Sequence, residues 1–352
     1  MIRATRRFLV ARAAAAVDLA FTRATDTLGR SRDRGVEAVD HETRLQHLAA
    51  IADAYPETTR GYFRPARTIR PTREPVSGDP GVADLIWESD YTTCHPAMAE
   101  RFAAARENGW VTARHLSAGR RGAPRPVLIL VHGYLGGNFT VERQVFPVEW
   151  LLGLGLDVVL FTLPFHGRRA EAGRRLPRFP GRDPRVTLEG FRQAAGDLVD
   201  LFEHLLAAGH PSVGLMGMSL GGYTTSLLAT LEPRMSCAVA LIPLASFADW
   251  AQEQGRLSPE PAAAAREHAA LERAYRLVSP LSREPVVAPA RVLVMAAQHD
   301  RITPPRHAER LAAHFRVPLL TFAGGHLLQL GRERALQHLA VMLRDQGVIP
   351  RA

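Results

Sequence analysis

Short runs of apolar residues recur along the chain from about residue 84 onward, and stretches of helical length separate most of them. The clearest run is VLILV at 127–131, and its unbroken apolar character is typical of a strand that is covered on both faces. Similar runs predict strands at 85–87, 110–116, 157–163, 213–216, 237–242, 291–297 and 318–323. Helices are predicted at 96–107, 140–153, 187–208, 220–231, 305–315 and 331–345. This alternation indicates an α/β fold with a mostly parallel central sheet and helices on both faces.

The first 82 residues follow a different pattern. A helix is predicted at 44–55, and residues 56–82 carry five prolines among several arginines, which favours an extended wrap or linker without repeating secondary structure. We therefore expect a helical N-terminal extension over 1–82, a main domain over 83–346 and a short tail at 347–352. Within the main domain, residues 245–290 form a longer connection than one crossover helix needs. This connection is expected to be either a lid over the sheet edge or a crossover helix with irregular loops.

The N-terminal helix is amphipathic. At about 100° per residue, one stripe is apolar, and arginines with one aspartate lie opposite. The apolar stripe comprises Val10, Ala14, Val17, Phe21, Ala24 and Leu28, and the polar side comprises Arg12, Arg23, Asp26 and Arg30. The segment is too short and too charged to span a bilayer, and it lacks the core and cleavage site of a signal peptide. We expect a cytoplasmic protein whose N-terminal helix either docks on the main domain or makes a peripheral contact with a membrane.

A glycine-flanked serine stands where one predicted strand meets the next helix. Gly217, Ser219 and Gly221 spell Gly-x-Ser-x-Gly within the stretch 212–224. A strand that turns directly into a helix strains its corner residue by about 1–3 kcal/mol. Glycines two residues before and after allow the close approach that this turn requires. The serine hydroxyl is then exposed beside the N-terminal dipole of a helix, as an acyl-transfer nucleophile requires.

Three further groups follow other predicted strands. The glycine-rich stretch 132–138 follows the strand at 127–131. Gly133 supports a turn in which the backbone N–H groups of Tyr134 and Leu220 both point at the developing oxyanion and form an oxyanion hole. Asp300 follows the strand at 291–297, and His326 lies in the loop after the last strand. Because the carboxyl ends of parallel strands share one edge of a sheet, we expect these groups to meet there.

The chain order Ser219, Asp300, His326, with an upstream loop that begins His-Gly, resembles the α/β-hydrolase superfamily over roughly residues 84–346. The resemblance implies that Ser219 is the nucleophile, His326 the general base and Asp300 the acid that orients it. Asp249 is a second candidate for the acid, because some members of the superfamily place it after the preceding strand. His166 lies in a Pro-x-x-Gly turn at 164–167 that also resembles this superfamily, and is expected to line or support the pocket mouth.

Composition indicates which classes of partner and cofactor to expect, but it does not identify a substrate. The net charge is +9 and all basic residues are arginine, but no nucleic-acid-binding motif accompanies them, so we expect no nucleic-acid partner. Cys94 and Cys237 lie in no metal-ligand spacing, and no metal or cofactor is implied. His132 is expected to be structural.

The expected function is therefore that of a serine hydrolase that cleaves a carboxylic ester, a thioester or a lipid acyl group, in the manner of esterases and lipases. One alternative is an acyltransferase that uses the same three residues. The other is a non-catalytic binding protein on this fold.

Overall fold

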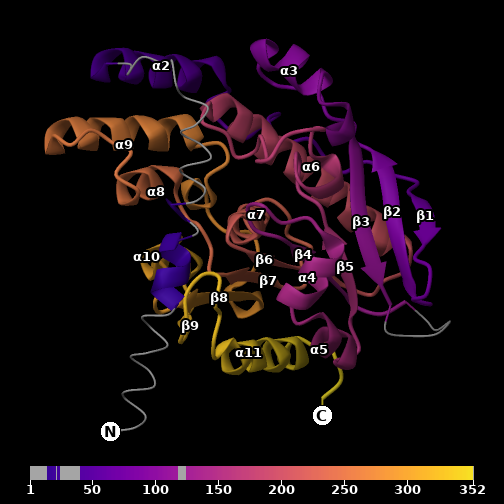
Figure 1. Cartoon of the computed structure of the whole chain (residues 1–352). Helices are drawn as coiled ribbons and strands as arrows, with labels where there is room; N and C mark the ends of the chain where they lie inside the picture. Colours follow the sequence, from indigo (N-terminus) through magenta and orange to yellow (C-terminus); the bar gives the residue numbers. More distant parts are fainter. Residues whose placement is uncertain (1–13, 21, 24–39, 118–123, 352) are drawn as a thin grey trace, which may run out of the picture.

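A nine-stranded sheet forms the centre of the protein (Figure 1). The computed structural model describes residues 14–20, 22–23, 40–117 and 124–351, and the strand order within them is β1-β2-β3-β5-β4-β6-β7-β8-β9. The pairs from β1 to β5 are antiparallel, whereas β5, β4 and β6 to β9 run parallel. The bounds are β1 Thr72–Pro75, β2 Val82–Glu88, β3 Trp110–Leu116, β4 Val127–Val131, β5 Asp157–Phe161, β6 Val213–Met218, β7 Ala238–Leu241, β8 Val292–Ala297 and β9 Leu319–Phe322. The mostly parallel sheet predicted from the apolar runs is confirmed.

Helices cover both faces of this sheet (Figure 1). On one face lie α6 (Pro184–Ala207), α7 (Leu220–Leu228) and α10 (Pro305–Phe315), and on the other α4 (Phe139–Val145), α5 (Val148–Gly153) and α11 (Arg332–Asp345). Side chains of β4 alternate between the two cores: Ile129 and Val131 pack with the first set, and Leu128 and Leu130 with the second. This two-sided burial explains why β4 is apolar at every position.

Two predicted helices are interrupted. The stretch 140–153 forms α4 and α5 with a break at Phe146 and Pro147, where Phe146 is extended at φ −81° and ψ 153°. A residue before proline is disfavoured in the helical region, so the chain turns there. The stretch 96–107 contains only one turn and a half of α-helix, α3 (Ala99–Ala103), flanked by 3₁₀ turns at Pro96–Met98 and Arg106–Gly109.

The sequence had suggested that the proline-rich segment 56–82 has no repeating secondary structure, and this expectation is wrong in one place. Residues Thr72–Pro75 form β1, which pairs with β2 at the edge of the sheet. All four residues of β1 are exposed, and an edge strand tolerates Pro75 because a missing N–H on its outer side breaks no ladder bond. Preceding this segment, α2 (His41–Ala54) packs against α9 (Pro261–Tyr275), as Figure 1 shows.

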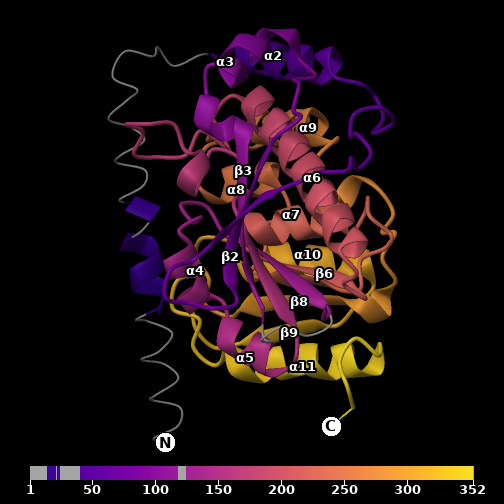
Figure 2. The same cartoon turned by 90° about the vertical axis from the view of Figure 1, so that its right-hand side faces the viewer.

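A buried carboxylate attaches the N-terminal part of the chain to α6. Glu189 is fully buried and accepts hydrogen bonds from the hydroxyls of Tyr55 and Tyr91 and from the backbone N–H groups of Cys94 and His95. The four donors come from the end of α2 and from residues 91–95 after β2, and in Figure 2 α6 lies below α2. Since a buried carboxylate is stable only when its oxygens are satisfied, these contacts fix residues 55–95 on the main domain.

The long connection at 245–290 contains two helices, α8 (Phe247–Glu253) and α9, followed by a 3₁₀ turn at Pro280–Ser282. It is therefore more than a single crossover helix, and α9 lies between α8 and α2 (Figure 1). Across the described ranges, no helix has both the length and the apolar character that a membrane span requires.

Candidate active site

Ser219 is the corner residue between β6 and α7. Its backbone has φ 57° and ψ −113°, a region that residues with a Cβ rarely occupy. The neighbouring glycines leave no space for a side chain: a Cβ on Gly217 would lie 1.9 Å from the carbonyl oxygen of Gly221, and one on Gly221 would lie 1.9 Å from that of Val131. The tight turn thus depends on both glycines, and it holds the Ser219 side chain at the carboxyl edge of the sheet.

The glycine-rich loop after β4 lies directly against Ser219. A Cβ built on Gly133 would be 3.3 Å from Ser219 Cβ and 3.8 Å from its Oγ. Within the described part of the chain, the backbone N–H groups of Tyr134 and Leu220 donate no hydrogen bond to the protein. Two unpaired donors beside a hydroxyl are what an oxyanion hole requires, because their hydrogen bonds are kept for charge that develops on the substrate.

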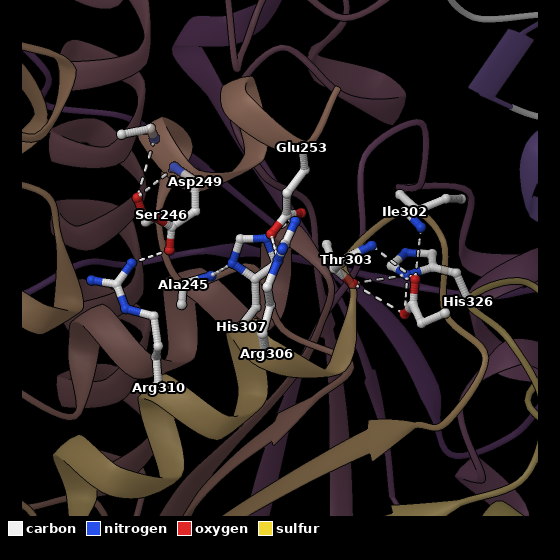
Figure 3. A network of polar contacts seen from close by, with 12 residues as sticks. Ala245, Ser246, Asp249, Glu253, Ile302, Thr303, Arg306, His307, Arg310 and His326 are labelled. Atoms are coloured by element: carbon white, nitrogen blue, oxygen red, sulfur yellow. Dashed lines mark hydrogen bonds and ion pairs between the residues drawn. The ribbon is translucent and has the colours of Figure 1, made fainter. Parts of the chain in front are cut away.

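Asp300 and His326 form a buried pair beside this turn. His326 Nδ1 lies 2.7 Å from Asp300 Oδ2, and both side chains are more than nine-tenths buried. The other oxygen of Asp300 accepts the backbone N–H groups of Ile302 and Thr303, each at 2.8 Å, so the carboxylate is fixed in its loop (Figure 3). With Nδ1–H bound to Asp300, the lone pair of Nε2 is available to accept a proton.

Thr303 is a member of this cluster that the sequence did not reveal. Its hydroxyl lies 3.0 Å from His326 Nδ1 (Figure 3). It also lies 3.1 Å from Asp300 Oδ2 and 3.0 Å from the carbonyl oxygen of Ile242. Ile242 follows β7, so the threonine connects the acid–histidine pair to the strand between β6 and β8. A threonine three residues after an aspartate is common in loops, and no sequence signal marks this one.

The pKa of His326 results from opposing effects. Burial lowers the pKa because it disfavours the charged imidazolium, whereas the charge of Asp300, its hydrogen bond and the charge of Asp18 raise it. The raising effects are larger, so the pKa of His326 lies above its ordinary value. The site therefore stabilises the protonated form of His326.

Ser219 and His326 lie on adjoining loops without a direct hydrogen bond between them, both residues being within the described ranges. Gln329 connects the loops: its side-chain N–H group donates to Met218 Sδ at 2.9 Å and to the carbonyl oxygen of His326 at 3.2 Å. Catalytic hydrogen bonds are often long without substrate and shorten when it binds. Gln329 thus holds the His326 loop against the end of β6, next to Ser219.

Two histidines beside the loop after β4, His132 and His166, are buried. His132 Nδ1 lies 2.7 Å from the carbonyl oxygen of Gly133, its Nε2 accepts the N–H of Leu163, and burial lowers its pKa to about 4. His166 is also buried, its pKa is well below its ordinary value because of burial, and its ring packs edge-on against Tyr134. His132 and His166 are therefore neutral, and His166 packs against both His132 and Tyr134 of the loop after β4.

Asp249 lies away from His326. Its carboxylate binds His268 Nε2 at 2.8 Å and the guanidinium of Arg310. In Figure 3, His307 stands between Asp249 and His326 and pairs with Glu253 on α8. Of the two aspartates considered as the acid, only Asp300 contacts His326.

Asp18 is the second residue of the site that the sequence did not reveal. The described helical turns at 14–20 pack on the histidine loop through Ala14 and Asp18, both fully buried, whereas Val17 is 38% exposed. The expected apolar stripe is therefore wrong at Val17, since the docked face is centred on a carboxylate. Arg23, assigned to the polar side, is exposed, and the remaining residues of both stripes lie outside the described residues.

Two other groups have ligand atoms close enough for a metal ion, namely His115 with Asp157 and His210, and Asp249 with His268 and Glu272. An arginine contacts a member of each group: Arg73 lies 3.3 Å from His115 Nδ1, and Arg310 pairs with Asp249. Asp157 begins β5, so the first group lies at the sheet edge opposite Ser219. Neither group belongs to the site around His326.

Comparison with known proteins extends this description. A profile of the prolyl oligopeptidase family matches residues 192–342. Two uncharacterized proteins of Mycobacterium tuberculosis, from the strains CDC 1551 / Oshkosh and H37Rv, are 36% identical over 218 residues, which is 59% of this chain. The chain spans about half (51%) of the length of these curated relatives.

Solved structures share the fold at low sequence identity. The acetyl xylan esterase of Paenibacillus sp. R4 superimposes with a TM-score of 0.54 at 14% identity, over 84% of this chain and 98% of that one. A puromycin-hydrolyzing peptidase of Mycobacterium tuberculosis gives a TM-score of 0.50 at 16% identity, over 77% of this chain and 40% of that one. The esterase and the peptidase are built on the same sheet architecture.

Proposed function

We propose that this chain, a serine hydrolase of the α/β-hydrolase superfamily, cleaves carboxylic esters of apolar acyl groups through a covalent acyl-enzyme on Ser219. The observation that carries the proposal is the buried 2.7 Å pair of His326 Nδ1 and Asp300 Oδ2. Gln329 joins the His326 loop to Met218, the residue before the strained Ser219. The unpaired N–H groups of Tyr134 and Leu220 support it, since they provide the donors that an oxyanion needs.

The proposed reaction has two halves. Ser219 Oγ forms a bond to the acyl carbon while its proton passes to His326 Nε2, and the carbonyl oxygen becomes an oxyanion held by Tyr134 and Leu220. The bond to the leaving alcohol then breaks, and the imidazolium returns the proton to the alcohol oxygen. Water repeats the sequence on the acyl-enzyme, which releases the acid and restores the Ser219 hydroxyl. Asp300 keeps its negative charge throughout and orients the ring.

Apolar side chains on the loops of the site favour an apolar acyl group. Leu135 follows the proposed oxyanion donor Tyr134 and is 39% exposed, and the histidine loop exposes Leu327, Leu328 and Leu330 by 37–47%. Leu135 lies on the loop that carries one proposed oxyanion donor, and the other three leucines lie on the loop that carries the proposed base. Exposed apolar side chains grouped around a site are typical of surfaces that bind apolar ligands.

A peptide bond is the second candidate for the scissile group. The match to the prolyl oligopeptidase family favours it, because it covers the segment 192–342 that contains Ser219, Asp300 and His326. An ester and an amide pass through the same acyl-enzyme, so the three side chains alone do not separate them. An acyltransferase would use the same acyl-enzyme with another acceptor, and a binding protein would form none.

The test combines a serine-directed fluorophosphonate probe with a panel of p-nitrophenyl esters from acetyl to decanoyl and of aminoacyl p-nitroanilides. Wild type should incorporate one probe at Ser219 and hydrolyse the medium-chain esters fastest, whereas Ser219→Ala should lose both labelling and turnover. Ser226→Ala is the matched control, because Ser226 is a buried serine of the same helix whose hydroxyl binds only the Gly222 carbonyl oxygen.

Each alternative gives a different result in this experiment. Faster turnover of the anilides than of the esters would replace the ester by a peptide substrate. Preferential transfer to an added alcohol or amine would indicate an acyltransferase. A folded wild-type protein that takes up no probe, or a Ser219→Ala variant that retains turnover, would refute the proposal.

A further inference from the structure

The carboxylate of Asp18 lies at the centre of the loops that carry the proposed acid and base. Oδ2 accepts the backbone N–H of His326 at 2.8 Å and that of Arg301 at 3.2 Å, and Oδ1 accepts that of Leu327 at 3.1 Å. Asp18 is fully buried and is separated from these donors by about 300 residues of sequence. The helix that carries it therefore contacts the loop that precedes α10 and the loop that follows β9.

The three donors belong to two different loops. Arg301 immediately follows Asp300, and His326 and Leu327 belong to the loop after β9. One carboxylate therefore connects the loop of the acid to the loop of the base. Charge-assisted hydrogen bonds from N–H groups to a carboxylate are roughly twice as strong as neutral ones, so this connection resists separation of the loops.

The fit between this helix and the histidine loop is close. A Cβ on Gly325 would lie 2.6 Å from Asp18 Oδ2 and 3.1 Å from Ala14 Cβ. Glycine at 325 is therefore required by the approach of the N-terminal helix, and not by its own backbone angles, which are not in the left-handed region. A single added methyl group would force the helix away from the loop.

We propose that Asp18 is a positioning residue of the active site, whose carboxylate holds the Asp300 loop and the His326 loop in the relative placement that proton transfer requires. The proposal rests on the proposed hydrolase function. In this proposal the N-terminal helix supplies a residue that the active site needs. Misplacement of a catalytic group by about 1 Å costs on the order of 100-fold in rate, so a lost connection between the loops should be visible in turnover.

The same contact has an electrostatic consequence for His326. The charged groups that face the imidazole are Asp300 from the loop after β8 and Asp18 from the N-terminal helix, and the hydroxyl of Thr303 is the neutral neighbour. Both charges raise the pKa of His326. Removal of the Asp18 charge should therefore lower this pKa and move the acidic limb of the pH profile to lower pH.

The experiment compares Asp18→Asn and Asp18→Ala with Leu19→Ala in the full-length protein, under conditions in which circular dichroism shows each to be folded. Leu19 is the matched control, because it is the next residue of the same helix and is 46% exposed. Both Asp18 variants should reduce kcat by about 10- to 100-fold with KM changed less than threefold. The rate of fluorophosphonate labelling should fall in parallel, the acidic limb should move down in pH, and Leu19→Ala should match wild type.

Gly325→Ala provides an independent perturbation that keeps Asp18, Asp300 and His326, and it carries the test if the Asp18 variants do not fold. As a single substitution it should reproduce the loss of kcat. In the Asp18→Ala background, where the alanine methyl group at 325 no longer meets a carboxylate, it should lower kcat by less than about a further twofold.

Wild-type kcat and an unmoved acidic limb in a folded Asp18→Asn variant would overturn the inference, and so would fully additive losses in the double variant. Failure of the proposed function is a different result, namely turnover retained in Ser219→Ala.

Discussion

Replacing Ser219 by glycine should give a more stable protein than replacing it by alanine, although both changes remove the proposed nucleophile. Ser219 occupies φ 57° and ψ −113°, a conformation that glycine adopts without penalty. The comparison to make is Ser219→Gly against Ser219→Ala. Both variants lack the hydroxyl, so its loss cancels, and the difference between them reports the backbone strain.

The magnitude follows from two opposing effects. Strain in this region costs of the order of 1–3 kcal/mol for a residue with a Cβ. Glycine loses more conformational entropy on folding than alanine, which offsets about 0.4–1 kcal/mol. Ser219→Gly should therefore exceed Ser219→Ala in free energy of unfolding by about 0.5–2 kcal/mol.

Equilibrium unfolding in urea is the suitable assay, because a shared slope lets the midpoints be compared directly. We expect the glycine variant to have the higher midpoint, and both variants to lack turnover and probe labelling. Equal midpoints would limit the strain to the entropy offset of about 0.4–1 kcal/mol and would refute the expected magnitude. A lower midpoint for glycine would refute the reasoning from φ and ψ.

Three further predictions concern the acid, the base and the turn. Asp300→Asn should lower kcat on the order of 10⁴-fold because the ring loses its tautomer partner, as in serine proteases, whereas steady-state assays of Asp249→Asn should show a change below about twofold. A neutral imidazole is needed as base, so kcat/KM should fall as the pH decreases through the raised pKa of His326; an acidic limb at or below about 6.5 in the pH–rate profile would contradict this. Gly221→Ala should lower the free energy of unfolding by about 3 kcal/mol or more, since its Cβ would lie 1.9 Å from Val131 O; an unchanged urea midpoint would count against that packing.

The sheet could be predicted because strands that are buried on both faces consist almost entirely of apolar residues, a pattern that is visible in the sequence. The run at 127–131 is apolar at each position since both faces of β4 are covered, and its predicted bounds agree with the structure. The helix predicted at 140–153 was less accurate because its apolar pattern continues through Pro147, where the backbone turns. β1 was missed since its four residues are exposed and include a proline.

The site could be predicted only in part. Ser219 has a local signature, because the turn needs glycines at fixed spacing, and His326 and Asp300 follow strand ends. The choice between Asp300 and Asp249 needed the structure, since both follow strands and only the side-chain partners distinguish them. Asp18 had no signal at all: an aspartate within an apolar run is typical of a solvent-facing position, and its partners are backbone groups at the other end of the sequence.

The burial of Glu189 has a consequence for how the protein unfolds. Its carboxylate has four donors from residues 55–95, and release of that stretch would lose all four hydrogen bonds at once. Hydrogen bonds to a charged group contribute about 1.5–3 kcal/mol each, which makes separate melting of the N-terminal stretch unfavourable. Residues 55–95 and α6 should therefore lose structure in one cooperative transition, and amide protons of the two should exchange with solvent at similar rates.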